Sequence, residues 1–220
     1  MRERLVAAKT ELIAPMPEPQ RGALPWLPLP ASLRRQRIGL RPERGLESES
    51  VAGSGAESSD RDFLGLLYAS TRLHEMAASG WPMSLQQRFL ADQFRLQDQH
   101  YRSHYPGMAR HIIERGGAPL GRLYLWRRDY SKQDDDPETA GVTAGPGEEL
   151  RVVDISLLPE WRGSGIGGDL LRGVQAMAAA AGGFVSLNVL QGNPALRLYQ
   201  RLGFKPVHSD GAYTLMHWRG

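Results

Sequence analysis

Residues 159–168 read Pro-Glu-Trp-Arg-Gly-Ser-Gly-Ile-Gly-Gly, and this stretch decides how the chain is interpreted. An apolar run at 150–158 precedes it and predicts a buried strand, and apolar residues at helical spacing follow it over 167–181. Glycines between a strand and a helix let backbone N–H groups point at an anion, and the helix N-terminus adds a favourable partial charge. The stretch therefore predicts a site for a phosphate-bearing ligand.

Two common phosphate-binding motifs do not fit. A Walker A loop needs Gly-Lys-Ser/Thr where the helix starts, but residues 167–169 read Gly-Gly-Asp. Gly163, Gly165 and Gly168 satisfy GxGxxG, yet a dinucleotide site also needs an acidic residue about 20 positions further on. Residues 186–189 contain no acid, so this interpretation is disfavoured as well.

A family resemblance fits better. Residues 162–167, Arg-Gly-Ser-Gly-Ile-Gly, resemble the R/Q-x-x-G-x-G/A acyl-CoA pyrophosphate loop of the GNAT superfamily of N-acetyltransferases. Residues 157–160 look like the strand end that leads into that loop. Residues 193–204, Asn-Pro-Ala-Leu-Arg-Leu-Tyr-Gln-Arg-Leu-Gly-Phe, resemble the second signature of the family. The resemblance is tight over 150–207 and loose before it.

The resemblance implies an α/β fold with a mixed, mostly antiparallel central sheet and helices on both faces. The order of the expected elements agrees with it. These are a strand at 37–42, a helix at 60–78, a second helix from Ser84 to the break at 105–107, hairpin strands at 111–114 and 120–127, a strand at 150–158, a helix at 167–181, a strand at 184–190, a helix at 193–202, and a terminal hairpin of 207–209 and 213–218.

The first 34 residues differ from the rest of the chain. Prolines recur there faster than a helix or a central strand tolerates, which predicts a mobile, proline-rich extension over 1–34. The alternative is an arm in which Trp26 and Leu27 dock on the body or on a partner. The acetyltransferase-like domain is then expected over 35–220.

Composition limits the remaining classes of protein. The chain has 220 residues, 41% hydrophobic and 23% charged, which suits one domain with a proper core. It contains no cysteine, which excludes disulfides, thiolate metal sites and an acyl-cysteine intermediate. Its basic residues form no cluster, so no nucleic-acid partner is expected. Without a signal peptide or a run of about 20 apolar residues, we expect a soluble, cytoplasmic protein. A homodimer is left open.

The resemblance implies acetyl-CoA as the acyl donor. Two parallel strands, 150–158 and 184–190, would splay apart, and the pantetheine arm would lie between them along the backbone of Leu157 and Leu158. Arg162 would add a charge-assisted contact to the pyrophosphate. Asn193 is expected both to contact the cofactor and to cap a helix. The pyrophosphate itself would be bound by the amides of Gly163, Ser164, Gly165, Ile166, Gly167 and Gly168.

The family mechanism is direct attack of an amine on the thioester in a ternary complex. Tyr199 stands where the family places the proton donor for the leaving thiolate; the alternative is a packed aromatic side chain. Asp154, an acid within a buried strand, is the expected base or amine-binding group. The alternatives are a carboxylate tied to an arginine, an acid at 148–149, or a water chain. Two other functions stay open: a silent acyl-CoA-binding module and a transferase for a larger acyl donor.

The acceptor is the least determined part of the interpretation. In the segments that build the acceptor site in this family, the acids are mainly Glu75, Asp92 and Asp98, which is few for a polyamine or aminoglycoside site. Peptide N-termini, lysine side chains and small amines remain open.

Other conspicuous residues give weaker signals. His100 and His104 have metal-compatible spacing, and residues 134–136 are three aspartates, but neither pattern completes a site and no metal is expected. The following aromatic residues are expected to line an acceptor pocket or to belong to the core: Trp81, Tyr101, Tyr105, Tyr124 and Trp126.

Overall fold

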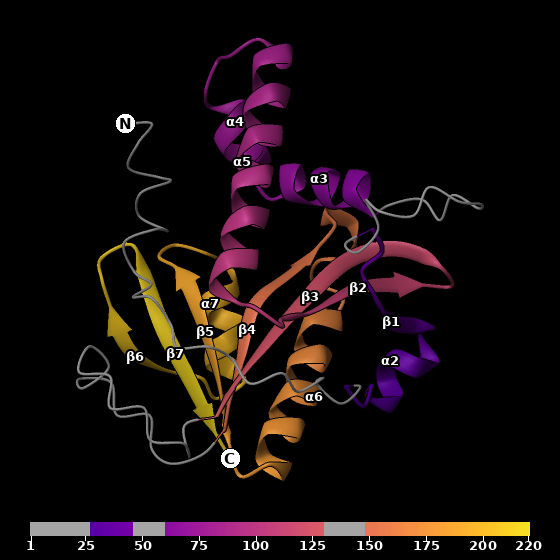
Figure 1. Ribbon diagram of the computed structural model, residues 1–220, viewed down its shortest axis with the longest axis vertical. Helices are drawn as coiled ribbons and strands as arrows, with labels where there is room; N and C mark the ends of the chain where they lie inside the picture. The colour runs from indigo at the N-terminus through magenta and orange to yellow at the C-terminus, as the bar shows by residue number, and fades with distance from the viewer. Residues whose placement is uncertain (1–26, 46–59, 130–147) are drawn as a thin grey trace.

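The computed structural model describes residues 27–45, 60–129 and 148–220 (Figure 1). Most of the proline-rich extension and two polar segments, one of which contains Asp134 to Asp136, lie outside the described residues.

The described residues form one seven-stranded sheet in the order β1-β2-β3-β4-β5-β7-β6. Neighbouring strands are antiparallel except β4 and β5, which are parallel, so the predicted mixed, mostly antiparallel sheet is confirmed. The strands are β1 (Ile38–Pro42), β2 (Ala109–Arg115), β3 (Ala118–Asp129), β4 (Glu148–Leu157), β5 (Phe184–Leu190), β6 (Lys205–Ser209) and β7 (Tyr213–Arg219).

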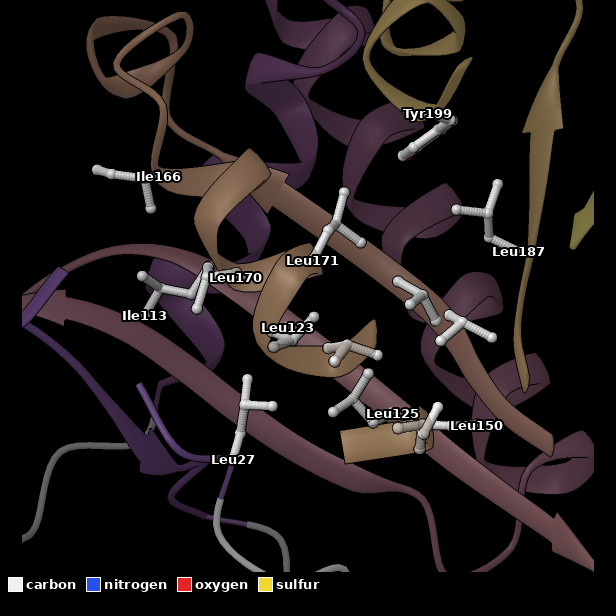
Figure 2. Close-up of a cluster of buried hydrophobic side chains, with 14 of the residues drawn as sticks. Leu27, Ile113, Leu123, Leu125, Leu150, Ile166, Leu170, Leu171, Leu187 and Tyr199 are labelled. Carbon is white, nitrogen blue, oxygen red and sulfur yellow. The ribbon is translucent and has the colours of Figure 1, made fainter. Parts of the chain in front are cut away.

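Helices cover both faces of the sheet. Along β3, Leu123 and Leu125 face a core shared with α6, whereas Tyr124 and Trp126 face a cluster that includes Tyr101 of α5. Figure 2 shows the first of these cores, with Leu170 and Leu171 of α6 close to the β3 leucines. The helices are α2 (Ala31–Arg35), α3 (Arg61–Ser70), α4 (Leu73–Ala77), α5 (Met83–His104), the short 3-10 helix η2 (Pro159–Trp161), α6 (Ile166–Ala180) and α7 (Ala195–Arg201).

The single helix expected over 60–78 is wrong, because the chain forms α3 and α4 with a break between them. At the break, the Ser70 hydroxyl donates to the Leu67 carbonyl and the Thr71 hydroxyl donates to the Tyr68 carbonyl, both at 2.7 Å. Hydroxyl side chains that bond to carbonyls of the preceding turn compete with the regular helical pattern. The apolar periodicity predicted the helical segment but carried no information on this local competition.

The part of the proline-rich segment that the structure describes packs on the body. Leu27 is 6% exposed and Leu33 of α2 is fully buried, both in the core shared with α6. Gly173 of α6 faces this segment: a Cβ there would lie at an ordinary contact distance of 3.5 Å from Leu27 Cδ1. The Ser32 hydroxyl also donates to the Asp169 carboxylate at 2.6 Å. Residues 27–34, assigned to the extension by the sequence analysis, therefore belong to the packed domain, and α2 was not foreseen.

A bulge in β4 shapes the middle of the sheet. Tyr124 pairs with Asp154 and the next residue, Leu125, pairs with Val152, so Val153 is an extra residue in β4. The parallel pairing of β4 with β5 ends at the same point, at Val152 and Leu187. Beyond it, β4 continues along β3 and β5 continues along β7, so the two strands part, as the resemblance implied.

Gly121 is expected to be required for close packing of β3 on β4. A Cβ at this position would overlap the Ser156 carbonyl and lie 2.7 Å from Leu157 Cδ2. Gly121→Ala should therefore destabilise the fold by about 1–3 kcal/mol, the usual cost of overpacking. Thermal unfolding measures this. Gly39→Ala is the matched control, because its Cβ would meet Glu114 at an ordinary 3.6 Å. Equal melting temperatures for the two variants would contradict the assignment.

Candidate functional site

A cleft of about 1410 Å³ opens where β4 and β5 part. The sheet strands β3, β4, β5 and β7 line it together with α7 and the N-terminus of α6, and the wall across from them comes from α3, α4 and α5. Nine of the predicted site residues line it: Asp154, Leu157, Arg162, Gly163, Gly165, Gly167, Gly168, Asn193 and Tyr199. The structure thus brings together most of the residues that the two sequence motifs indicated.

Three predicted residues point elsewhere. Leu158 packs against the cluster between α3, α5 and β2. Ile166 is fully buried in the α6 core. The Ser164 hydroxyl donates to the Trp161 carbonyl at 2.6 Å. The side chains of these residues therefore shape the loop from outside the cleft.

The glycine loop has the backbone conformation that an anion site needs. Gly163 and Gly165 have φ values of 73° and 88°, in the left-handed region that favours glycine. Gly165 is the N-cap residue of α6, and its carbonyl accepts the Asp169 N–H at 3.0 Å. The N-terminus of this 15-residue helix, which carries a partial positive charge, therefore faces the cleft. The neighbouring residues Gly163 and Gly165 have no side chain that would block an anion.

Arg162 is engaged away from the loop amides. Its Nε donates to the Leu157 carbonyl at 2.9 Å. Its Nη2 donates to the Ser70 hydroxyl at 3.0 Å and to the Ser70 carbonyl at 3.3 Å. The side chain thus joins the end of β4 to the end of α3.

Asp154 lies on the floor of the cleft and is tied to an arginine, one of the alternatives left open. Its Oδ2 accepts Arg122 Nη2 at 2.6 Å and the Tyr101 hydroxyl at 3.0 Å. Its Oδ1 accepts the Ser156 hydroxyl at 2.6 Å. Arg122 Nη2 also donates to Gln97 Oε1 at 2.8 Å. The side chains of Asp154 and Arg122 are only 11% and 4% exposed.

The donors around Asp154 keep their protons at neutral pH. Burial raises the pKa of Tyr101 well above its usual value, and the charge of Asp154 raises it further. Burial disfavours the charged form of Arg122, but Asp154 and two tyrosines outweigh it and raise the Arg122 pKa. The Asp154 carboxyl is therefore surrounded by hydrogen-bond donors from Arg122, Tyr101 and Ser156.

Tyr199 presents a protonated phenol to the same cleft. It lies on α7, is 8% exposed, and packs edge to face against Phe204 with ring centroids 5.9 Å apart. Burial and the charge of Asp154 raise the pKa of Tyr199 to about 12. Asn193 lies two residues before α7, and its Oδ1 accepts the N–H of Ala195, the first residue of the helix, at 2.9 Å.

The other acids considered for catalysis or acceptor binding are mostly outside the cleft. Glu149 is buried and accepts hydrogen bonds from Arg151 and Ser186. Asp98 pairs with Arg110 and Arg102, and exposed Asp92 pairs with Arg95. Glu75 lines the cleft, where it pairs with Arg72 at 2.9 Å.

The five singled-out aromatic residues divide between pocket and core. Tyr101 and Tyr105 line the cleft, while Tyr124 and Trp126 are buried beneath them. Trp81 packs edge-on against Phe89 at the start of α5. Several polar or aromatic residues of the cleft were not predicted from the sequence, because no local motif marks them. They are Tyr68, Arg72, Gln97, Arg122, Ser156 and Tyr213.

The two histidines form a stacked pair. The His100 and His104 rings lie 4.0 Å apart, and His104 Nδ1 is 2.9 Å from the His100 carbonyl. Within residues 27–45, 60–129 and 148–220, no group of three or more His, Cys, Asp or Glu side chains could bind a metal. In the same residues, no helix combines the length and apolarity that crossing a membrane requires.

Comparisons with known proteins agree with this geometry. Residues 109–206, from β2 into β6, match the acetyltransferase (GNAT) domain family. A mycothiol acetyltransferase of Thermobifida fusca is 36% identical over 104 residues, which are 46% of this chain and 29% of that protein. The match thus spans less than a third of the length of that relative.

Solved structures share the fold. A PaiA N-acetyltransferase from Thermoplasma acidophilum, in complex with coenzyme A, aligns with a TM-score of 0.51 and 15% identity over 83% of this chain and 99% of that one. PH1933 from Pyrococcus horikoshii aligns with a TM-score of 0.52 and 16% identity over 83% and 98%. Residues 109–206 are thus similar to the acetyltransferase (GNAT) domain family, and the described residues share the fold of these solved structures.

Proposed function

We propose that the protein transfers an acetyl group from acetyl-CoA directly to a primary amine, in a ternary complex and without an acyl-enzyme. The observation that carries the proposal is the parting of β4 and β5 at Val152 and Leu187, which opens a cleft between the glycine loop and Tyr199. The mycothiol acetyltransferase relative and the fold shared with a coenzyme A complex support it.

The donor is proposed to lie along the opened edge of β4. The pantetheine amides would pair with backbone groups near Leu157 and Leu158, and the pyrophosphate would accept N–H groups of residues 163–168 at the N-terminus of α6. The thioester would then lie between Asp154 and Tyr199, both of which line the cleft.

The acceptor nitrogen is proposed to bind at Asp154. An alkylamine with a pKa near 10.4 is only about one part in a thousand neutral at pH 7, so it arrives as an ammonium. Asp154, which accepts hydrogen bonds from Arg122, Tyr101 and Ser156, would accept a further one from it. The ammonium loses one proton to water, the neutral amine forms the new C–N bond, and the C–S bond breaks. Tyr199 donates its proton to the departing thiolate and regains one from the attacking nitrogen through water.

The walls of the cleft favour an acceptor with a single amine. Of the three described acidic residues that line the cleft, Glu75 is paired with Arg72 and Asp169 with Arg172, which leaves Asp154 for one ammonium group. Four tyrosines supply hydroxyl groups instead: Tyr68, Tyr101, Tyr105 and Tyr213. A polyamine or aminoglycoside would need several unpaired carboxylates, so a polar small molecule or a peptide with one reactive amine is the proposed acceptor.

The glycine loop can be tested by a charge placed at the N-terminus of α6. Gly165→Glu should lower the affinity for acetyl-CoA by more than about 100-fold, because a carboxylate there repels the pyrophosphate and the residue is strained at φ 88°. Isothermal titration measures this. Gly117→Glu is the matched control, with the same φ of 88° in the β2–β3 turn and open space around it. Similar affinities in the two variants would reject the loop as the donor site.

Tyr199→Phe tests the proton donor. We expect kcat to fall by about 10²- to 10⁴-fold, the usual contribution of a general acid. The affinity for acetyl-CoA should stay the same, since the ring still packs on Phe204. Thiol release against a panel of amino acids, peptides, amino sugars and polyamines provides the rate. An unchanged kcat would assign Tyr199 to packing alone. Binding of acetyl-CoA without turnover of any amine would favour the silent acyl-CoA-binding module.

Asp154→Asn tests the amine-binding site. Loss of a charge-assisted hydrogen bond worth about 1.5–3 kcal/mol should raise the KM for the amine by about 10- to 100-fold, with little change for acetyl-CoA. The variant should also melt at a lower temperature, because Arg122 is left buried without its counter-ion. Asp98→Asn is the control: it breaks the ion pairs with Arg110 and Arg102 outside the cleft. It should lower stability but leave the amine KM unchanged. Equal KM effects would contradict the role of Asp154.

A further inference from the structure

Arg162 spans the two halves of the cleft. On the donor side its Nε donates to the Leu157 carbonyl, at the end of β4 and just before the glycine loop. On the acceptor side its Nη2 donates to both oxygens of Ser70, the last residue of α3. One side chain therefore connects the expected cofactor loop to the opposite wall.

The C-terminus of α3, which Arg162 contacts, forms part of that wall. The helix stops at Ser70, and the next residues, Thr71 and Arg72, line the cleft together with Tyr68. Carbonyls at a helix C-terminus lack intrahelical partners and carry partial negative charge, so a guanidinium placed there is favourable. The Ser70 hydroxyl accepts from Arg162 while it donates to the Leu67 carbonyl, so this contact also reaches back into the last turn.

The loop is fixed on its other side as well. The Arg115 guanidinium lies 5.3 Å from the ring centroid of Trp161, and Ser164 bonds back to the Trp161 carbonyl. Trp161 thus contacts Arg115 of β2, and the Ser164 hydroxyl closes the turn formed by residues 161–164. A displacement of the loop moves Arg162, and through it the end of α3.

We propose that Arg162 is a positioning residue that couples the donor loop to the acceptor wall, instead of a direct ligand of the pyrophosphate. The identity of the two ligands rests on the proposed function, whereas the connection itself rests on the hydrogen bonds of Arg162 to Leu157 and Ser70. Donor binding at residues 163–168 then restrains Thr71 and Arg72 and strengthens acceptor binding. Acceptor binding in turn raises the affinity for the donor by the same factor.

The connection is tested first without any ligand. In Arg162→Gln, amide hydrogen exchange at Thr71 and Arg72 should become about two- to tenfold faster, as expected when one or two hydrogen bonds are lost. These amides donate to the Tyr68 and Ala69 carbonyls, so they report the end of α3 directly. Ser70→Ala should give a smaller change in the same direction, because the carbonyl contact remains. Arg95→Gln, which removes an exposed arginine of α5, should change neither.

The coupling is tested with coenzyme A and the amine found in the turnover panel. In the wild type, coenzyme A should slow exchange at Thr71 and Arg72, and this effect should be absent in Arg162→Gln. That variant should raise the KM for the amine about fivefold, while kcat and the affinity for coenzyme A change by less than about threefold. A loss of coenzyme A affinity of tenfold or more, with unchanged exchange in α3, would overturn the proposal and make Arg162 a pyrophosphate ligand. Failure of the wild type to bind coenzyme A would reject the proposed function, while the ligand-free exchange would still decide whether Arg162 fixes α3.

Discussion

The cleft depends on how far β4 and β5 stay paired. The two strands are parallel neighbours from Glu149 to Val152, and the extra residue Val153 ends that pairing. A bulge bends its strand and increases the local twist, so the remainder of β4 stays with β3 while β5 stays with β7. The backbone edge exposed in this way lines the cleft together with the glycine loop that follows β4 and the N-terminus of α6.

The sequence predicted those parts of the fold that depend on local chemistry. The predicted bounds of β5, Phe184 to Leu190, agree with the structure, and α6 is displaced by one residue at each end. In both cases an apolar pattern lies between glycines. The break in α3 was missed because Ser70 and Thr71 look like ordinary helix residues until their hydroxyls bond to carbonyls. The packed helix α2 was missed because prolines dominated the segment before it.

The candidate site likewise contains residues that could be predicted from the sequence and residues that could not. The glycine loop and Tyr199 were predictable because each belongs to a contiguous motif, and both line the cleft. The partners of Asp154 were not, since Arg122 reaches it through the register of β3 on β4 and Tyr101 through the packing of α5. Periodicity shows that a residue faces inward but does not show which distant side chain it meets. The direction of the Arg162 side chain could not be predicted either, because the motif that contains Arg162 does not indicate a contact with Ser70.

The buried charge of Asp154 affects two groups in the proposed reaction, the attacking amine and Tyr199. Taking a carboxylate and a guanidinium out of water is costly, and a well-packed apolar pair would often be as stable or more so, so stability alone does not explain this ion pair. A fixed negative charge at the point where β4 and β5 part acts on two groups at once. It favours positive charge on an attacking nitrogen, and it opposes ionisation of Tyr199, whose pKa it helps to raise to about 12. Under the proposed mechanism, the Asp154 carboxylate thus both attracts the amine and helps to keep the proton donor Tyr199 protonated.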